Sequence, residues 1–169
     1  MNHINNTVAS VQSAVYHSPL GCILLEADEA GLTALRFLDR DCPESSPFPG
    51  PVLSAAAAWL DEYFAGKSPE PEFPLHLAGT PFQREVWKII QSIPRGQTMT
   101  YGQIARQLAA DRGITRMASQ AVGQALSKNP VCLVIPCHRV LGSGGKLTGY
   151  AGGLERKKAL LDLEGACIR

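Results

Sequence analysis

The stretch VIPCHRV (residues 134–140) places a cysteine between a proline and a histidine, at the end of an apolar run. A cysteine that served only for packing would be expected inside such a run, as Cys132 is, because a free thiol behaves as a small buried hydrophobe. Cys137 is instead followed directly by His138. A thiolate that is assisted by a base is a strong nucleophile, so these residue types predict nucleophilic chemistry at Cys137.

The first half of the chain predicts a small antiparallel sheet followed by one helix. Three apolar segments, SAVYHS, CILLEAD and LTALRFL, are separated by the turn signals PLG and EAG. In the segment 52–66, Leu53, Ala57, Leu60 and Phe64 share one helical face, and a glycine suited to a left-handed cap ends it. The proline-rich segment 67–80 follows, so we expect two domains, 1–78 and 79–169.

The second half predicts short helices that begin at clear N-terminal signals. Thr80 with Gln83, and Thr100 with Gln103, have the spacing of capping boxes. The second of these starts a short helix, and after a turn at DRGIT the segment 116–129 forms another. A short helix, a turn and a second helix are typical of a DNA-binding helix-turn-helix.

Charge separates the two halves of the chain. Residues 1–78 contain three basic and ten acidic residues, a net charge of −7, whereas residues 79–169 contain thirteen basic and five acidic residues, a net charge of +8. The segment 116–129 is rich in small residues, which fits either tight packing on another helix or close approach to DNA, and the charge favours DNA. The basic residues around this motif are Arg106, Arg112, Arg116 and Lys128.

Cysteine and histidine spacing predicts neither a disulfide framework nor a metal site. The five cysteines form no CxxC pair, which favours reduced thiols, and the four histidines are scattered. The glycine cluster GSGG lacks the context of a dinucleotide site, so no cofactor is expected. No apolar stretch approaches the roughly 20 residues that span a bilayer, and the N-terminal segment lacks the features of a signal peptide. We therefore expect no membrane association and a cytoplasmic location.

The motifs together resemble one family, the methylated-DNA protein-cysteine methyltransferases, also called O6-alkylguanine-DNA alkyltransferases. The resemblance is strongest over residues 80–165, through TPFQREVW, TYGQIA, AVGQAL, NP, IPCHRV, TGYAGG and LEG in family order and spacing. It implies a mixed α/β fold, with a small antiparallel-sheet domain of ribonuclease H-like type before a mainly helical domain with a winged helix-turn-helix. It also implies DNA repair by direct reversal, in which the protein acts as a monomer on double-stranded DNA that contains O6-alkylguanine.

The resemblance assigns the chemistry to five residues. Cys137 would accept the alkyl group irreversibly and without a cofactor, in a single turnover. O4-methylthymine is a possible second substrate. His138 would activate the thiol through a water molecule, and Glu164 would orient the histidine. The Tyr101 hydroxyl would stabilise charge on the purine as the alkyl group leaves, and Asn129 would support the cysteine turn.

The resemblance also implies which residues hold the DNA and the base. The target nucleotide must leave the stack, and many family members fill the gap with an arginine, where this sequence has Gln120. We expect Gln120 to enter the stack in its place. Two positions that align with the zinc ligands of vertebrate members hold Asp28 and Thr33, so no zinc is expected there. The remaining predicted DNA and substrate contacts are Arg116, Ser119, Ala121, Lys128, Arg139, Val140, Tyr150 and Ala151.

Three other functions use some of the same features. A thiolate beside an imidazole can attack acyl carbons, so a cysteine hydrolase is an alternative that multiple turnover on an ester would reveal. A binder of alkylated DNA without reactivity would lack the acceptor cysteine, which is present here as Cys137. A gene regulator would use the helix-turn-helix but would not need the PCHRV motif.

Overall fold

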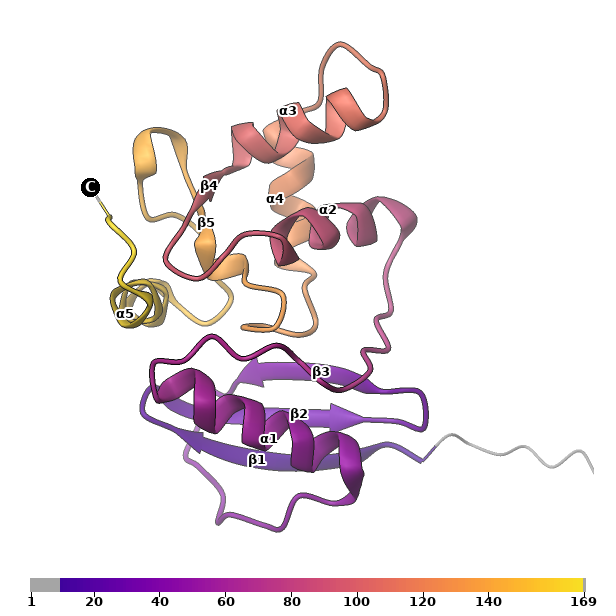
Figure 1. Ribbon diagram of the computed structural model, residues 1–169, viewed down its shortest axis with the longest axis vertical. Coiled ribbons are helices and arrows are strands. Elements are labelled where there is room, and N and C mark those ends of the chain that lie inside the picture. The colour runs from indigo at the N-terminus through magenta and orange to yellow at the C-terminus, as the bar shows by residue number, and fades with distance from the viewer. Residues whose placement is uncertain (1–9, 169) are drawn as a thin grey trace, which may run out of the picture.

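The computed structural model describes residues 10–168 and has a mixed α/β architecture, with a three-stranded antiparallel sheet below a group of short helices (Figure 1). The first nine residues, on which the expectation about targeting partly rests, lie outside this range. Within the described range no helix has the length and apolarity that a membrane crossing requires. The strands are β1 (Gln12–Ser18), β2 (Gly21–Ala27), β3 (Leu32–Phe37), β4 (Met99–Thr100) and β5 (Val140–Leu141). The α-helices are α1 (Gly50–Phe64), α2 (Pro81–Gln91), α3 (Tyr101–Asp111), α4 (Ser119–Ser127) and α5 (Leu154–Glu164).

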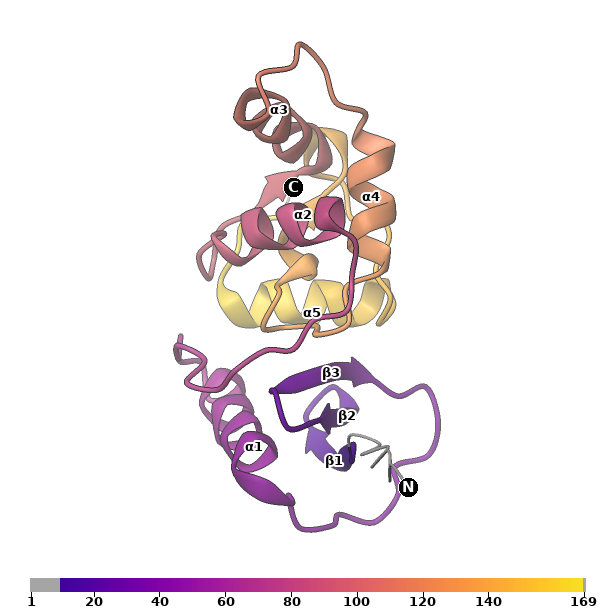
Figure 2. The same cartoon turned by 90° about the vertical axis from the view of Figure 1, so that its right-hand side faces the viewer.

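The first half forms the predicted meander, with the strands in the order β1, β2, β3. Helix α1 covers one face of this sheet (Figure 2). Its residues Leu53 and Leu60 are fully buried in one core with Ile23 and Leu25 of β2, so apolar burial fixes the helix on the sheet. The three predicted strands are confirmed, and so is the helix predicted over residues 52–66, which spans residues 50–64 in the structure.

The backbone of strand β3 also forms hydrogen bonds with two segments that are distant in the sequence. The backbone N–H of Leu32 donates to Pro74 and its carbonyl accepts from His76. Further along, the Leu35 N–H donates to Pro130 at 2.9 Å, and the Cys132 N–H donates to Leu35 at 2.8 Å. The edge of the N-terminal sheet therefore holds the backbone that leads to Cys137.

In the second half, helices α2 and α3 begin where the capping signals predict. Both capping boxes are formed: the Thr80 and Thr100 side chains accept from the N–H groups of Gln83 and Gln103. Helices α3 and α4 pack together, and the two-residue strands β4 and β5 pair in parallel beside them. The second box caps the N-terminus of α3, so it fixes where the helix that carries Tyr101 begins.

The expectation that all five cysteines are reduced is wrong. The structure joins Cys22, at the start of β2, to Cys42, in the loop that follows β3, as a disulfide. Their Cα atoms lie 5.6 Å apart, within the usual range for such a bond. The chain folds the loop back onto the hairpin, which the 20-residue sequence separation does not reveal.

Candidate active site

Cys137 begins a single 3₁₀ turn, Cys137–Arg139, directly after Pro136. Its backbone N–H donates to Ile135 at 2.8 Å. The same Ile135 carbonyl accepts from Asn129 Nδ2 at 2.8 Å, while Asn129 Oδ1 accepts from the Val131 N–H at 3.0 Å. Asn129 thus bridges the two ends of the segment before the cysteine, while its role in the reaction stays a prediction.

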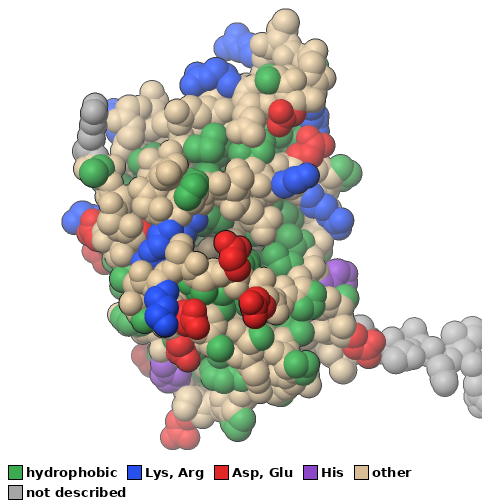
Figure 3. Space-filling model, in the orientation of Figure 1, with side chains coloured by type: hydrophobic (Ala, Val, Ile, Leu, Met, Phe, Trp, Pro, Cys, Tyr) green, Lys and Arg blue, Asp and Glu red, His purple; other side chains and the backbone are tan. Residues whose placement is uncertain are grey.

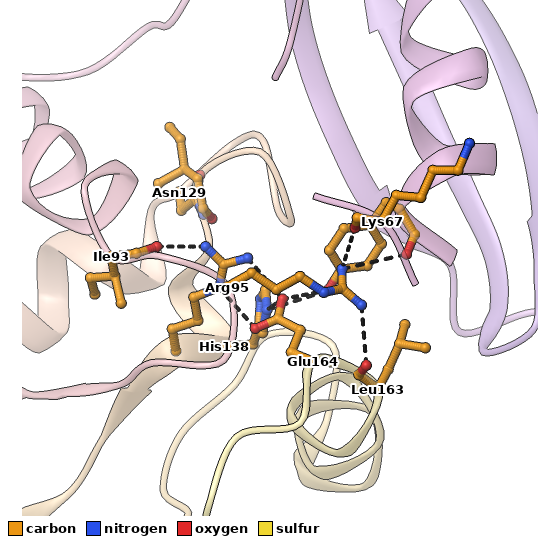
Figure 4. Close-up of polar contacts among 10 residues, drawn as sticks. Lys67, Ile93, Arg95, Asn129, His138, Leu163 and Glu164 are labelled. Atoms are coloured by element: carbon orange, nitrogen blue, oxygen red, sulfur yellow. Dashed lines mark hydrogen bonds and ion pairs between the residues drawn. The ribbon is translucent and has the colours of Figure 1, made fainter. Parts of the chain in front are cut away.

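A buried carboxylate lies behind the cysteine turn. Glu164, at the end of α5, accepts from His138 Nε2 at 2.7 Å through its Oε1 atom (Figure 4). Arg139 donates to both carboxylate oxygens at 2.9 Å and also to the Ile93 carbonyl at 2.6 Å. The Tyr63 hydroxyl, from α1, donates to Glu164 Oε1 at 2.7 Å. The carboxylate therefore collects donors from the cysteine turn and from the N-terminal half.

These contacts set the protonation of the relay. Burial raises the pKa of Glu164, but hydrogen bonds from His138 and Arg139 outweigh it and hold that pKa well below its usual range. Burial lowers the pKa of His138, despite the carboxylate beside it. The imidazole is therefore neutral at pH 7, with its proton on Nε2 facing Glu164. Nδ1 has no hydrogen-bond partner among the described residues, so its lone pair is available to a proton.

The pKa of the Cys137 thiol is lowered. A hydrogen bond from the Cys132 thiol is the largest cause; burial opposes it, and Asn129 and the positive charge of Lys157 assist. Cys132 stays protonated, because the same contact and its own burial raise its pKa. Neutral Cys132 therefore acts as a donor to the Cys137 thiolate, which is the nucleophilic form.

A cavity of about 240 Å³ opens over the thiol. Tyr101, at the start of α3, and Tyr150 lie in its wall, and the buried Tyr150 hydroxyl has no hydrogen-bond partner within residues 10–168. The cavity thus combines apolar faces with polar groups that a planar base could engage. Its lining residues are Tyr101, Gly123, Leu126, Ser127, Asn129, Cys132, Cys137, Gly149, Tyr150 and Ala151.

Lys157 of α5 holds one wall of this cavity in place. Its side chain is fully buried, and its ammonium group donates to the carbonyls of Val140, Thr148 and Gly149 at 2.5, 2.7 and 3.3 Å. Burial lowers the pKa of Lys157 to about 8. The lysine therefore ties β5 to the segment that carries Tyr150 and Ala151.

The predicted DNA contacts divide into two groups. Arg116, Ser119, Gln120 and Lys128 are exposed on or beside α4, and Ala121 is half-buried. Basic side chains also gather at the α3 end of the face in Figure 3. Arg139, by contrast, is directed to Glu164 and Ile93, so the structure places it in the relay and not on the DNA-facing surface. Of the pocket residues, Tyr150 and Ala151 line the cavity, and Val140 is held by Lys157.

Sequence reasoning missed three residues of the site: Tyr63, Cys132 and Lys157. One signal was present for the lysine, since Lys157 and Glu164 share a helical face with the fully buried Leu160 and Leu161. Charged residues on an apolar face must be paired, so this pattern indicates a buried polar site. Tyr63 and Cys132 carry no comparable local signal.

This geometry defines a protein that acts through a cysteine nucleophile, and comparison with known proteins gives its family. The sequence model described as "6-O-methylguanine DNA methyltransferase, ribonuclease-like domain" matches residues 11–77, and the one described as the "DNA binding domain" of the same methyltransferase matches residues 81–166. The chain belongs to the 6-O-methylguanine DNA methyltransferase family.

Relatives and solved structures agree with this assignment. A methylated-DNA–protein-cysteine methyltransferase of Methanosarcina acetivorans is 42% identical over 91% of this chain and 98% of its own length. One from Mycobacterium tuberculosis is 45% identical over 87% of this chain and 88% of its own. The crystal structure of M. tuberculosis O6-methylguanine methyltransferase matches with a TM-score of 0.78 and 42% identity, covering 92% of this chain and 93% of that one. A structure of the M. tuberculosis protein OGT in complex with DNA matches with a TM-score of 0.77 and 44% identity, covering 89% and 91%.

We expect Cys132→Ala to slow the reaction of the Cys137 thiol at pH 7. The hydrogen bond to the thiolate is lost, so the pKa of Cys137 rises. The pH profile of the reaction rate therefore shifts to higher pH. A bond worth roughly 1 kcal/mol corresponds to a severalfold loss. Cys132→Ser keeps a donor and should restore most of the rate. An unchanged pH profile in Cys132→Ala would contradict the assignment.

We expect Tyr63→Phe to reduce both stability and the rate of Cys137 reaction, without changing DNA affinity. Removing a donor to a buried carboxylate costs about 1.5 to 3 kcal/mol of unfolding free energy. Because folding lowers the pKa of Glu164, its stabilisation is present at neutral pH and declines as pH falls through its folded pKa, so the variant and the wild type should converge in acid.

Tyr16→Phe is the matched control, since the Tyr16 hydroxyl donates to Asp61 at 2.6 Å, outside the relay. Chemical unfolding from pH 7 downward, together with single-turnover rates and DNA-binding measurements, checks the prediction. An equal loss of rate in both variants would show that Tyr63 has no specific role in the relay.

Proposed function

We propose that this protein repairs alkylated DNA by direct reversal, with Cys137 as the acceptor and O6-alkylguanine as the substrate. The observation that carries the proposal is a thiol of lowered pKa, buried at the base of a cavity and next to a neutral histidine–carboxylate pair. The names of the relatives and the DNA complex of the M. tuberculosis protein support it.

The proposed reaction is a displacement at the alkyl carbon. The Cys137 proton passes through a water molecule to His138 Nδ1, and Glu164 stabilises the imidazolium that results. The sulfur then attacks the alkyl carbon, the bond from that carbon to O6 breaks, and the electron pair stays on the guanine. The Tyr101 hydroxyl donates to the purine as negative charge grows on it, which favours the transition state over the ground state.

The product explains why the protein would act once. The new sulfur–carbon bond is a thioether, which has no readily ionised leaving group, and the proposed chemistry includes no second nucleophile to remove the alkyl group. A hydrolase would instead release its acyl group to water and react again. Stoichiometry therefore separates the two functions.

We propose that α3 and α4 form a helix-turn-helix that binds the duplex, with α4 nearest the DNA. Exposed Arg116 and Lys128 flank α4 and suit contacts to phosphates. Gln120, in the first turn of α4, would enter the base stack and pair through its amide with the orphaned cytosine.

We further propose that a monomer suffices and that it works in the cytoplasm, with 1–78 and 79–169 as its domains. The relay and the cavity described above are built from residues of one chain. An acceptor thiol must stay reduced before it meets a lesion, which suits a reducing compartment.

Intact-protein mass spectrometry tests the reaction directly. Incubation with duplex DNA that contains O6-methylguanine should add a single methyl group to the wild type, on the peptide that contains Cys137. Cys137→Ser should remain unmodified, while Cys167→Ser, which changes an exposed cysteine near the C-terminus, should react normally. An unmodified wild type, or repeated turnover with restoration of the original mass, would overturn the proposal.

Replacement of Gln120 tests the proposed intercalation. We expect Gln120→Ala to lower the repair rate and the affinity for lesion-bearing duplex, because alanine is too short to occupy the space that the flipped base leaves in the stack. Gln124→Ala, which alters another exposed glutamine of α4, should change neither. Equal rates and affinities for Gln120→Ala and the wild type would show that Gln120 stays outside the stack.

A further inference from the structure

We propose that His17, Cys22 and Cys42 form a binding site for a thiophilic divalent cation of the zinc class when the two cysteines are reduced. One ligand atom from each residue lies within 4.8 Å of the ligand atoms of the other two. A tetrahedral zinc site needs ligands about this close, because its bonds to sulfur and nitrogen are roughly 2.0 to 2.3 Å long. The cluster is remote in sequence from the relay and uses none of its residues.

Strand register fixes the relative positions of two of the three ligand residues. His17 of β1 and Cys22 of β2 are direct cross-strand partners at the end of the first hairpin. Partners in an antiparallel pair project from the same face of the sheet, with Cβ atoms about 4.5 to 5.5 Å apart. The hairpin therefore holds an imidazole beside a thiol before any cation binds.

Backbone contacts bring the third ligand to this pair. The Leu38 N–H donates to the Cys22 carbonyl at 2.8 Å, so the chain after β3 starts beside the hairpin. His17 Nε2 lies 3.1 Å from the carbonyl oxygen of Pro43, the residue after Cys42. The disulfide itself shows that the Cys42 sulfur can reach the Cys22 sulfur.

The hydrogen bond of His17 also sets which ring nitrogen can bind a cation. A carbonyl can only accept, so Nε2 must carry the proton, and Nδ1 of the neutral ring keeps its lone pair. Metal-binding histidines commonly donate their second nitrogen to a carbonyl or carboxylate in this way. Two thiolates and one imidazole select a soft or borderline cation such as Zn²⁺ over Mg²⁺ or Ca²⁺. A water molecule would complete the fourth position.

The disulfide and the cation site exclude each other, because they use the same two sulfurs. A dithiol reductant would supply two electrons and two protons, opening the sulfur–sulfur bond to give two thiols while its own thiols become a disulfide. Cation binding would then displace the two thiol protons. Cys42 is exposed, so a reductant can reach the bond. In a reducing compartment the cation would take over the disulfide's role of holding the loop on the hairpin.

The test uses the full-length protein reduced with a phosphine, and Co²⁺ as a spectroscopic probe that Zn²⁺ should displace. The reduced wild type should bind a single equivalent of Co²⁺, with thiolate-to-cobalt charge-transfer bands and the visible bands of a tetrahedral ion. Oxidised protein should bind none at this site. Cys42→Ser and His17→Gln should weaken Zn²⁺ binding at least about tenfold, measured by competition with a chromogenic chelator.

Matched controls separate this site from other thiols. Cys137→Ser and Cys167→Ser should keep the full cobalt spectrum, and Cys42 is exposed, so its replacement should leave the fold intact by circular dichroism. Absence of stoichiometric binding by the reduced wild type, or unchanged binding in Cys42→Ser, would overturn the proposal. Normal alkyl transfer by Cys42→Ser would not affect it, so its outcome is independent of the proposed repair function.

Discussion

The burial of one carboxylate constrains the whole molecule. Glu164 is 8% exposed and carries a negative charge, which would be strongly destabilising without close partners. Those partners come from separate parts of the chain: Tyr63 from α1, and His138 and Arg139 from the cysteine turn. The carboxylate can be satisfied only when α1, α5 and the cysteine turn are all in place. Assembly of these elements therefore also orients the His138 ring.

The N-terminal half consequently belongs to the active site. The sheet edge at Leu35 holds the backbone at Pro130 and Cys132, and α1 contributes Tyr63. Arg95 strengthens the same junction: it donates to the Lys67 and Leu163 carbonyls at 2.8 and 3.1 Å (Figure 4) and lies over the Tyr63 ring. The acidic N-terminal half thus supports the candidate site through backbone hydrogen bonds at Leu35 and through the Tyr63 hydroxyl.

The sequence predicts local structure well and long-range contacts poorly. The strands and capping boxes are confirmed, because alternating apolar residues and a threonine three residues before a glutamine act within one segment. On α1, Leu53 and Leu60 are buried and Phe64 packs against the core, as its helical face predicts. The pattern does not single out Tyr63, which is more deeply buried and whose hydroxyl has a partner in α5. The disulfide and the role of Cys132 also arise from segments that meet only in the folded chain. A family resemblance names the residues of the relay, but their further partners become visible only in the folded chain.

The depth of Cys137 has a consequence for selectivity. The pKa of the Cys137 thiol is lowered and yet the residue is only 6% exposed, so reactivity and access are controlled separately. A sulfur of this kind on an open surface would be consumed by any small electrophile in solution. Here an electrophile must first enter the cavity lined by Tyr101, Tyr150 and residues of α4 before it reaches the sulfur. The fold thereby shields the Cys137 thiol from reagents in bulk solution.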